Sequence, residues 1–309
     1  MNLAFIITAY KYPEQLIRLV GRLYEPNRHF FVHVDKKTSP AIFEKMVQGL
    51  NRFSNVHFLK RYVCHWGAFG IVQATIDGLN KLAESELEYD YVVYMTGQCY
   101  PIKRNSLMDD FLDKHKGTSF IDYSPFPRQS WWTGGYDRIE NWHFHLFGNY
   151  LCTRLQSIQN LRYIHPCWKI RRLANVVFPK RTFPHALHPY GGSGHWCLHR
   201  THINYLHRFM RERPDFVKFF KFVHVPDETF FQTILANSPF KNELVNQTLH
   251  FIKWPTKPSK HPLLLRLEDF DELASSPALF ARKFDTTVDD QILDRLDKDI
   301  LHAVPHQAM

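Results

Sequence analysis

Two adjacent carboxylates stand in front of an apolar, aromatic segment around position 228. The run reads Pro226-Asp227-Glu228-Thr229-Phe230-Phe231. A carboxylate at the mouth of an apolar site can act as a general base, since partial burial raises its pKa toward neutral pH. The same residues also suit a helix N-terminus, where carboxylates cap the chain and interact favourably with the helix dipole. Both roles, catalytic and structural, are open for Glu228.

A second feature is a glycine cluster, Gly191-Gly192-Ser193-Gly194. Closely spaced glycines let a backbone approach a ligand tightly. The spacing is neither that of a dinucleotide fingerprint nor that of a P-loop. A plain tight turn is the alternative interpretation.

Cations are frequent in the last third of the chain, where they could neutralise a leaving diphosphate in place of a metal ion. No D-x-D follows a strand, and Asp269-Phe270-Asp271 opens an expected helix, where capping explains it. The histidine pairs lack a third ligand, so we expect no metal site and no cofactor. For any one of these cations, the alternative to a role in binding the diphosphate is that it is simply an exposed charge on the surface. The cations are Lys253, Lys257, Lys260, Arg266, Arg282 and Lys283.

The first third of the chain alternates between strand and helix patterns, which predicts βαβ units with a mostly parallel sheet. Ligands of such sheets bind beyond the carboxyl ends of the strands. Three expected strand ends carry polar residues, namely Thr8, His33 with Asp35, and Thr96-Gly97. The expected strands are 3–9, 30–34, 56–58 and 91–95, and the expected helices are 13–23, 42–50 and 71–83.

The remainder is predicted from shorter patterns. Residues 119–189 are expected to form long loops with helices at 150–161 and 168–176. Further on we expect strands at 196–198 and 263–265, and helices at 201–211, from about 227, at 269–274 and at 288–300. With no repeat and no clear linker, we expect one domain over 1–309. Its nucleotide-binding half is residues 1–115, and its acceptor-binding and catalytic half is residues 116–309.

Composition narrows the class of protein. The net charge is +9 with 19 histidines besides, and 44% of residues are hydrophobic. A basic surface suits nucleotide diphosphates, nucleic acid or an anionic membrane. The five cysteines form no C-x-x-C pair, which favours reduced thiols. No run approaches the roughly 20 apolar residues of a membrane span. We expect a cytoplasmic protein, either soluble or held peripherally on the inner face of the membrane.

The alternative to an enzyme is a binding protein without catalytic activity. A basic protein in which 15% of residues are aromatic could bind glycans or nucleic acid without chemistry. The aromatics are not interleaved with Lys and Arg in a compact motif, so no nucleic-acid partner is expected.

In their order along the chain, these motifs resemble a known family. They are His33-Val34-Asp35, Trp66-Gly67, the segment from Tyr91 to Lys103, Gly192-Ser193-Gly194-His195-Trp196, Pro226-Asp227-Glu228, Lys253-Trp254, His261-Pro262 and Phe280-Ala281-Arg282-Lys283-Phe284. The set resembles the core-2/I-branching β-1,6-N-acetylglucosaminyltransferases and the peptide O-xylosyltransferases, which are family 14 glycosyltransferases. The resemblance extends from about Phe5 to Asp285.

The resemblance implies a GT-A type fold, a UDP-GlcNAc or UDP-xylose donor, inversion at the anomeric carbon, and no need for a metal. Glu228 matches the family's catalytic base. Lys283 matches the cation that neutralises the diphosphate, together with a second cation that falls on Lys260, or on Arg266. The nucleotide contacts fall on Thr8, His33, Asp35 and Gly97. The acceptor contacts fall on Trp254, which would stack on a sugar, and on Arg138, Gly192, Ser193 and Asp227.

This sequence departs from the animal enzymes by lacking their membrane anchor, stem and lumenal disulfide cysteines. It therefore resembles a bacterial, cytoplasmic relative. We expect a saccharide acceptor that is lipid-linked or a precursor of a surface polysaccharide. The basic surface would then lie close to anionic lipid.

Overall fold

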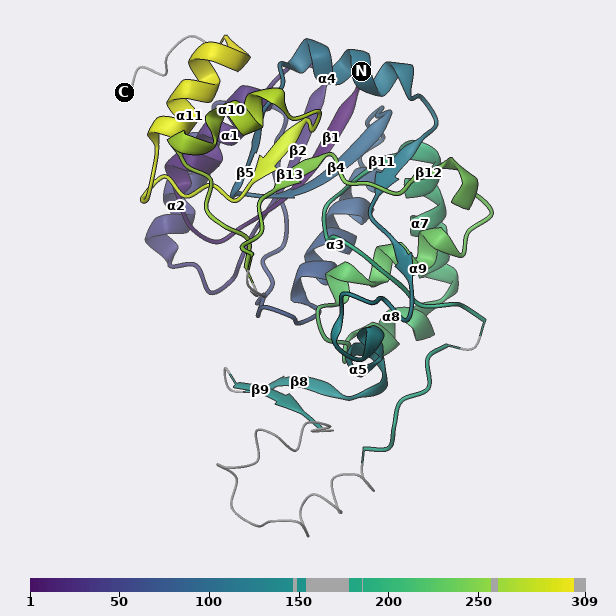
Figure 1. Cartoon of the computed structure of the whole chain (residues 1–309). Helices are drawn as coiled ribbons and strands as arrows, with labels where there is room; N and C mark the ends of the chain where they lie inside the picture. The colour runs from purple at the N-terminus through teal and green to yellow at the C-terminus, as the bar shows by residue number, and fades with distance from the viewer. Residues whose placement is uncertain (147–148, 154–177, 185, 257–260, 303–309) are drawn as a thin grey trace.

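A seven-stranded, mostly parallel sheet forms the centre of the computed structural model (Figure 1). The structure describes residues 1–146, 149–153, 178–184, 186–256 and 261–302. The strand order is β12-β6-β11-β4-β1-β2-β3. The strands are β1 (Leu3–Ala9), β2 (Arg28–Val34), β3 (Val56–Phe58), β4 (Tyr91–Thr96), β6 (Ser119–Ile121), β11 (Trp196–His199) and β12 (Leu244–Val245). Strand β11 is antiparallel to both of its neighbours, whereas the other pairs are parallel.

Alternating side chains of β1 enter two separate cores, because successive residues of a strand point to opposite faces. Leu3, Phe5 and Ile7 belong to one hydrophobic cluster. Ala4 and Ile6 belong to the other. Both sets are fully buried, so the sheet is covered on both sides, as expected for parallel strands.

Helices form the outer layers. One face packs against α1 (Pro13–Leu23), α2 (Pro40–Leu50), α4 (Asn105–Lys114), α10 (Phe270–Ser275) and α11 (Gln291–Leu296), which continues as a π-helical turn, Asp297–Leu301. The other face packs against α3 (Gly70–Glu84), α7 (Arg200–Glu212), α8 (Pro214–Phe220) and α9 (Phe230–Ala236). Figure 1 shows the two groups on either side of the sheet.

Smaller elements surround one end of the sheet. Strands β13 (His250–Ile252), β14 (Phe280–Arg282) and β5 (Cys99–Pro101) form a three-stranded sheet. Two further pairs are β7 (Ser124–Pro125) with β10 (Tyr190–Gly191), and β8 (His143–Leu146) with β9 (Asn149–Cys152). The short helix α5 (Tyr136–Glu140) and the β8–β9 hairpin lie at the end of the molecule away from the N-terminus (Figure 1). Short 3-10 turns cover Trp132–Gly135, Pro226–Glu228, Lys241–Glu243 and Leu267–Asp269.

The predicted α/β class, with a mostly parallel sheet flanked by helices, is confirmed. The arrangement agrees with the GT-A type that the resemblance implies. All seven elements expected before residue 96 are present within a few residues. Strands from both predicted halves enter the one central sheet, since β11 pairs with β4, and β6 and β12 follow β11 outward in the same sheet.

Three local predictions need correction. The helix expected over 150–161 is wrong at its start, where β9 pairs with β8. The rest of that range, like the helix expected at 168–176, lies outside the described residues. Residues 263–265 form no strand, although Leu265 donates its amide to the Lys283 carbonyl at 2.9 Å. The helix expected from about 227 begins only at Phe230, after a 3-10 turn.

No helix in the described ranges is long and apolar enough to cross a membrane. Cys64, Cys99 and Cys197 are thiols and not disulfide-bonded.

Candidate active site

The polar ends of three neighbouring strands meet as predicted. The Asp35 amide donates to the Ala9 carbonyl, and the Gly97 amide donates to the Thr8 carbonyl, each at 2.9 Å. The Thr8 hydroxyl lies 3.1 Å from the hydroxyl of Tyr94. These bonds tie together the carboxyl ends of β1, β2 and β4, which is the edge where ligands of α/β sheets bind.

His33 and Asp35 shape the loop after β2. The His33 ring is buried, and its Nε2 accepts from the Tyr62 amide at 3.0 Å. Burial lowers the pKa of His33 to about 4, so the ring is neutral. Asp35 accepts from the amides of Lys37 at 2.9 Å and Cys64 at 3.4 Å. Both predicted nucleotide residues therefore also organise the backbone around them.

Glu228 faces a positive partner from a distant segment. Its Oε2 accepts from Nη1 of Arg138, on α5, at 2.7 Å. The Arg138 guanidinium also lies 3.5 Å from the ring centre of Trp131, so it is held in place by stacking as well as by charge. About one third of the Glu228 side chain remains exposed. This carboxylate is thus accessible to a substrate while supported from one side.

Asp227 is held in a different environment from its neighbour. Asp227 is half-buried, and the backbone of Gly194 packs against its carboxyl. This burial, together with the adjacent Glu228, raises the pKa of Asp227 to about 7, although Arg138 and Arg282 oppose the rise. When two adjacent carboxyl groups lie in unequal environments, one can stay protonated while the other stays ionised.

The capping interpretation of the two carboxylates is wrong. They lie in the 3-10 turn Pro226–Glu228, and Val225 before it adopts a left-handed φ of 50°. Helix α9 has Thr229 as its N-cap, without a side-chain capping bond. The turn holds Glu228 outside the helix, directed at Arg138.

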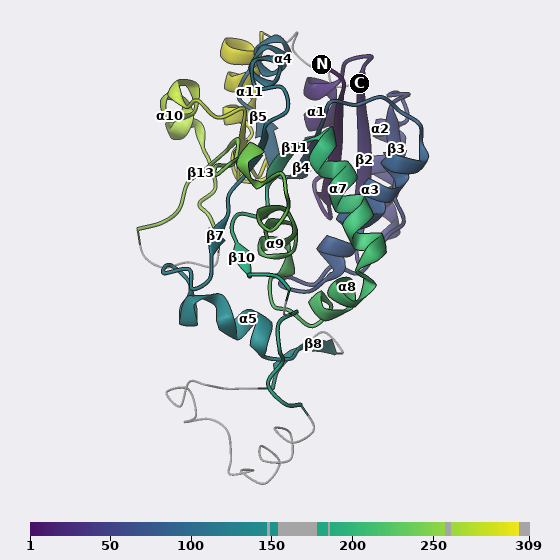
Figure 2. The ribbon, with the colours of Figure 1, turned by 90° about the vertical axis from the view of Figure 1, so that its right-hand side faces the viewer.

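The glycine cluster permits a close approach within the protein, rather than a turn with unusual φ. None of these glycines has a positive φ. The Gly192 amide donates to the Glu228 carbonyl at 2.8 Å. A Cβ at Gly192 would lie 1.7 Å from the Asp122 carbonyl oxygen, and one at Gly194 would lie 3.1 Å from Oδ2 of Asp227. The loop therefore fixes the backbone of Glu228, and β10 at its start lies beside α9 (Figure 2).

Ser193, the other residue predicted in this loop, is held from two sides. Its amide donates to Asp122 Oδ2 at 2.9 Å, and its carbonyl accepts from the Gln232 side chain at 2.7 Å. The side chain of Arg128 donates to the same Asp122 oxygen at 3.2 Å and to the Gly191 carbonyl at 2.6 Å. The loop is therefore rigidly supported beside Glu228.

The structure describes two of the three cations that were predicted to bind the diphosphate. Lys283 follows β14 and is half-buried, and burial lowers its pKa, with Arg282 and Lys11 lowering it further. Arg266 is exposed, next to Leu265, whose amide bonds to Lys283. Lys260 lies outside the described residues. Sequence reasoning did not assign Lys11, although its position just after the polar end of β1 was a usable signal.

Exposed aromatics lie near the expected acceptor side. Trp254 is 55% exposed and Trp66 is 53% exposed, so both rings are open to stack on a sugar. The Gly67 carbonyl accepts from the Val225 amide at 2.9 Å. This bond joins the Trp66-Gly67 motif to the turn that carries Glu228.

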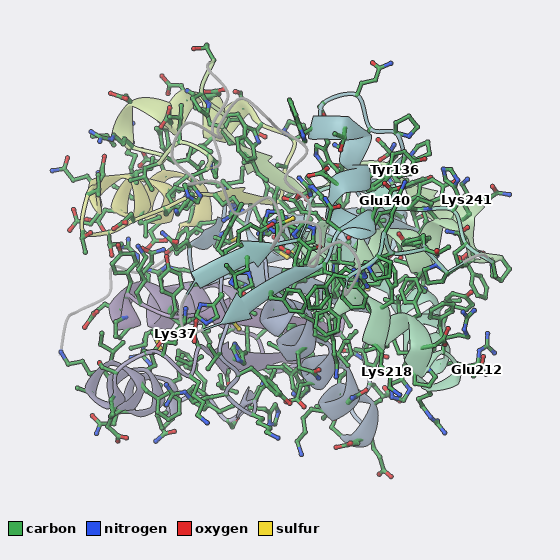
Figure 3. All side chains as sticks on the ribbon, turned by 90° about the horizontal axis from the view of Figure 1, so that it is seen from below. Lys37, Tyr136, Glu140, Glu212, Lys218 and Lys241 are labelled. Carbon is green, nitrogen blue, oxygen red and sulfur yellow. The ribbon has the colours of Figure 1, made fainter. Side chains whose placement is uncertain are left out.

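A cavity of about 500 Å³ lies on another side of α5, lined by Tyr136, Glu140, Lys180 and Phe183 among others. Figure 3 labels Tyr136 and Glu140 on this helix. Arg138 and Glu228 do not line it, so we place the chemistry at Glu228 and not in this cavity. Within the described ranges, no three His, Cys, Asp or Glu side chains are grouped to hold a metal ion.

A family model described as "Branch: Core-2/I-Branching enzyme" matches residues 3–274. The chain belongs to the Core-2/I-Branching enzyme family. The matched range contains the Arg138–Glu228 pair, the glycine loop and the three polar strand ends. The expectation stated from the motifs is confirmed at the level of the family.

Relatives of known name are glycosyltransferases. Beta-glucuronosyltransferase GlcAT14B of Arabidopsis thaliana is 27% identical over 97% of this chain and 66% of its own length. Xylosyltransferase 2 of Rattus norvegicus is 25% identical over 94% of this chain and 32% of its own. Xylosyltransferase 1 of Homo sapiens is 23% identical over 96% of this chain and 30% of its own. The chain thus spans between about a third and two thirds of the length of these relatives.

A remote likeness is found among solved structures. The galactosyltransferase LgtC, in complex with donor and acceptor sugar analogs, aligns at a TM-score of 0.42 and 13% identity, over 98% of each chain.

Proposed function

We propose that this protein is an inverting, metal-independent glycosyltransferase that moves a sugar from a UDP-sugar to a hydroxyl of a saccharide acceptor. The observation that carries the proposal is the accessible Glu228 carboxylate, held by Arg138 at 2.7 Å and by the glycine loop. Membership of the Core-2/I-Branching enzyme family supports it.

The proposed reaction is one displacement. Glu228 takes the proton of the acceptor hydroxyl as that oxygen attacks the anomeric carbon of the donor. The new bond joins the acceptor oxygen to this carbon, and the bond to the diphosphate oxygen breaks on the opposite face, so UDP leaves and the configuration inverts. Lys283, with Lys260 or Arg266 as the sequence predicts, neutralises the charge that develops on the diphosphate. Positioned proton transfer of this kind contributes about a hundredfold or more to the rate.

The proposal also concerns which sugar the donor carries. The resemblance of the motifs favours UDP-GlcNAc, with UDP-xylose as the alternative. The names of the relatives add UDP-glucuronate as a third candidate. Incubating the protein with each donor and measuring released UDP would identify the donor.

Inversion and metal independence need separate measurements. We expect NMR of the product to show a β-linkage from an α-linked donor. We also expect turnover to persist in a chelator. Retention of configuration at the anomeric carbon would rule out the single-displacement mechanism. If activity is lost in chelator and restored by a divalent ion, lysine and arginine side chains do not replace a metal ion at the diphosphate.

We further propose that the acceptor is a lipid-linked or surface-polysaccharide saccharide. The net charge of +9 favours contact with an anionic membrane surface. Co-sedimentation with anionic vesicles at low salt, and its loss at moderate salt, is the expected result. Failure to bind such vesicles at low salt would contradict the membrane contact.

A further inference from the structure

Three cations from two distant segments converge beyond the ends of β1 and β14. Lys11 lies two residues after β1, while Arg282 ends β14 and Lys283 follows it. The Gln15 side chain joins the segments, since its Nε2 donates to the Gly97 carbonyl at 2.9 Å and to the Phe284 carbonyl at 3.3 Å. This cation cluster therefore lies at the edge of the sheet where the predicted nucleotide residues also meet.

Asp285 is the carboxylate that pairs with this cluster in the described part of the chain. Its Oδ2 lies 3.5 Å from Nζ of Lys11 and accepts from the Tyr12 hydroxyl at 2.6 Å. Nζ of Lys11 in turn donates to the Tyr12 hydroxyl at 2.6 Å. The Tyr12 hydroxyl thus fixes the Lys11 ammonium near Lys283.

Lys283 has no comparable partner among the described residues. It is half-buried, and its pKa is lowered by burial, by Arg282 and by Lys11, with Asp285 opposing. Two ammonium groups and a guanidinium close together repel each other, so the cluster is suited to bind an anion with more than one negative charge.

Arg282 also acts electrostatically on buried groups away from Lys11. Burial lowers the pKa of the His195 and His250 imidazoles, and the charge of Arg282 lowers it further. Burial raises the pKa of the Cys99 thiol, and the charge of Arg282 opposes that rise. Its Nε is itself buried. The ammonium groups that remain available for a ligand at this edge are therefore those of Lys11 and Lys283, whose side chains are both partly exposed.

We propose that Lys11 is the second cation that holds the donor's diphosphate beside Lys283, in the role that the sequence assigned to Lys260 or Arg266. The inference rests on the proposed function, because it takes the anion to be the diphosphate of a UDP-sugar. Each ammonium donates to a non-bridging phosphate oxygen, and Lys11 keeps its bond to Tyr12. As the anomeric bond breaks, the pair stabilises the added charge on the departing UDP.

Calorimetric titration with UDP, UMP and uridine tests the assignment. Lys11→Met should weaken UDP binding about 10- to 100-fold, the range of a hydrogen bond to a charged group. It should weaken UMP binding much less and leave uridine binding unchanged. Lys11→Arg should keep most of the UDP affinity, which separates loss of charge from misfolding. The matched control is Lys180→Met, because Lys180 also pairs with a carboxylate, Glu140, but lies in the separate cavity beside α5.

The outcomes distinguish the two proposals. If Lys11→Met binds UDP as tightly as the wild type while Lys283→Met does not, Lys11 is no diphosphate ligand, but the glycosyltransferase proposal stands. An equal loss for UDP, UMP and uridine would assign Lys11 to general support of the site and overturn its diphosphate role. If the wild type neither binds UDP nor turns over any UDP-sugar, both proposals fail.

Discussion

The guanidinium of Arg138 lies 2.7 Å from the carboxylate of Glu228, although 90 residues separate them in the chain. Arg138 comes from α5, and Glu228 from the 3-10 turn before α9. The bond between the His224 amide and the Arg138 carbonyl, at 3.0 Å, holds these two segments together. The proposed base is therefore positioned by an element outside its own segment.

Replacing Glu228 by Gln should reduce kcat about a hundredfold or more, because the amide cannot accept the acceptor's proton. Affinity for UDP should be nearly unchanged, since the proposed role of the carboxylate is to act on the acceptor. Steady-state kinetics with the preferred donor, paired with UDP titration, measures both effects. Near-normal turnover by a folded Glu228→Gln protein would show that another group is the base.

Replacing Arg138 by Met should reduce kcat/KM for the acceptor about 10- to 100-fold, because it removes a charge-assisted hydrogen bond from Glu228. Arg138→Lys should recover part of this activity, since charge remains while the stacking on Trp131 is weakened. The control is Arg213→Met, which breaks an exposed ion pair with Asp215 that contributes little. Equal activities for Arg138→Met and the control would contradict the positioning role.

The raised pKa of Asp227, about 7, predicts a pH-dependent stability. The folded protein binds this proton more tightly than the unfolded chain does, so the stabilising contribution is present below pH 4 and lost as pH rises through about 7. Asp227→Asn cannot ionise. Its Tm, measured relative to the wild type, should therefore rise with pH between 4 and 7 and level off above that range. A difference in Tm that is constant with pH would show that Asp227 is not buried as an acid.

Lys283 predicts how UDP binding depends on pH. In the proposed mechanism its ammonium form binds the diphosphate, and burial holds its pKa below the ordinary 10.5. As pH is raised, UDP affinity should therefore begin to fall at a lower pH than it would if Lys283 had the ordinary pKa of a lysine. Titrating the wild type and Lys283→Arg across the alkaline range measures this, because the arginine stays charged. The same fall in both proteins would assign the effect to another group.

Gly192→Ala should destabilise the protein by about 1–3 kcal/mol, because the new Cβ would lie 1.7 Å from the Asp122 carbonyl oxygen. Activity should fall as well, since the loop that binds the Glu228 carbonyl must shift. Gly117→Ala serves as a comparison. Its Cβ would meet nothing within 4 Å, but its φ of +91° strains an alanine by about 1 kcal/mol. Chemical denaturation of the three proteins would measure both costs, and an unaffected Gly192→Ala protein would contradict the close approach.

The sequence itself determined much of the fold in the first third of the chain. Strands β1 and β4 and helices α1 and α3 follow from local patterns, because apolar residues buried on both faces of a strand or on one face of a helix recur at a fixed period. The motif Pro226-Asp227-Glu228 likewise marked the segment that carries the accessible carboxylate. The polar strand ends Thr8, Asp35 and Gly97 could be expected to meet, since parallel strands end at the same edge.

Short segments were decided by their partners and not by their own residues. Tyr150 lies in a strand because β9 pairs with β8. Leu263–Leu265 is apolar but makes only single backbone bonds to Lys253 and Lys283, so it forms no strand. A few residues carry too little periodicity to fix their structure, and the neighbouring backbone decides it.

The environment of the site came from tertiary structure alone. Which arginine meets Glu228, how Asp227 acquires a pKa near 7, and how Lys11 comes to lie beside Asp285 all depend on segments that are far apart in sequence. Electrostatic interactions and desolvation depend on distance in space, whereas residue patterns report only neighbours along the chain. The residue types therefore indicated the chemistry, and the packing of distant segments determined which of them act together.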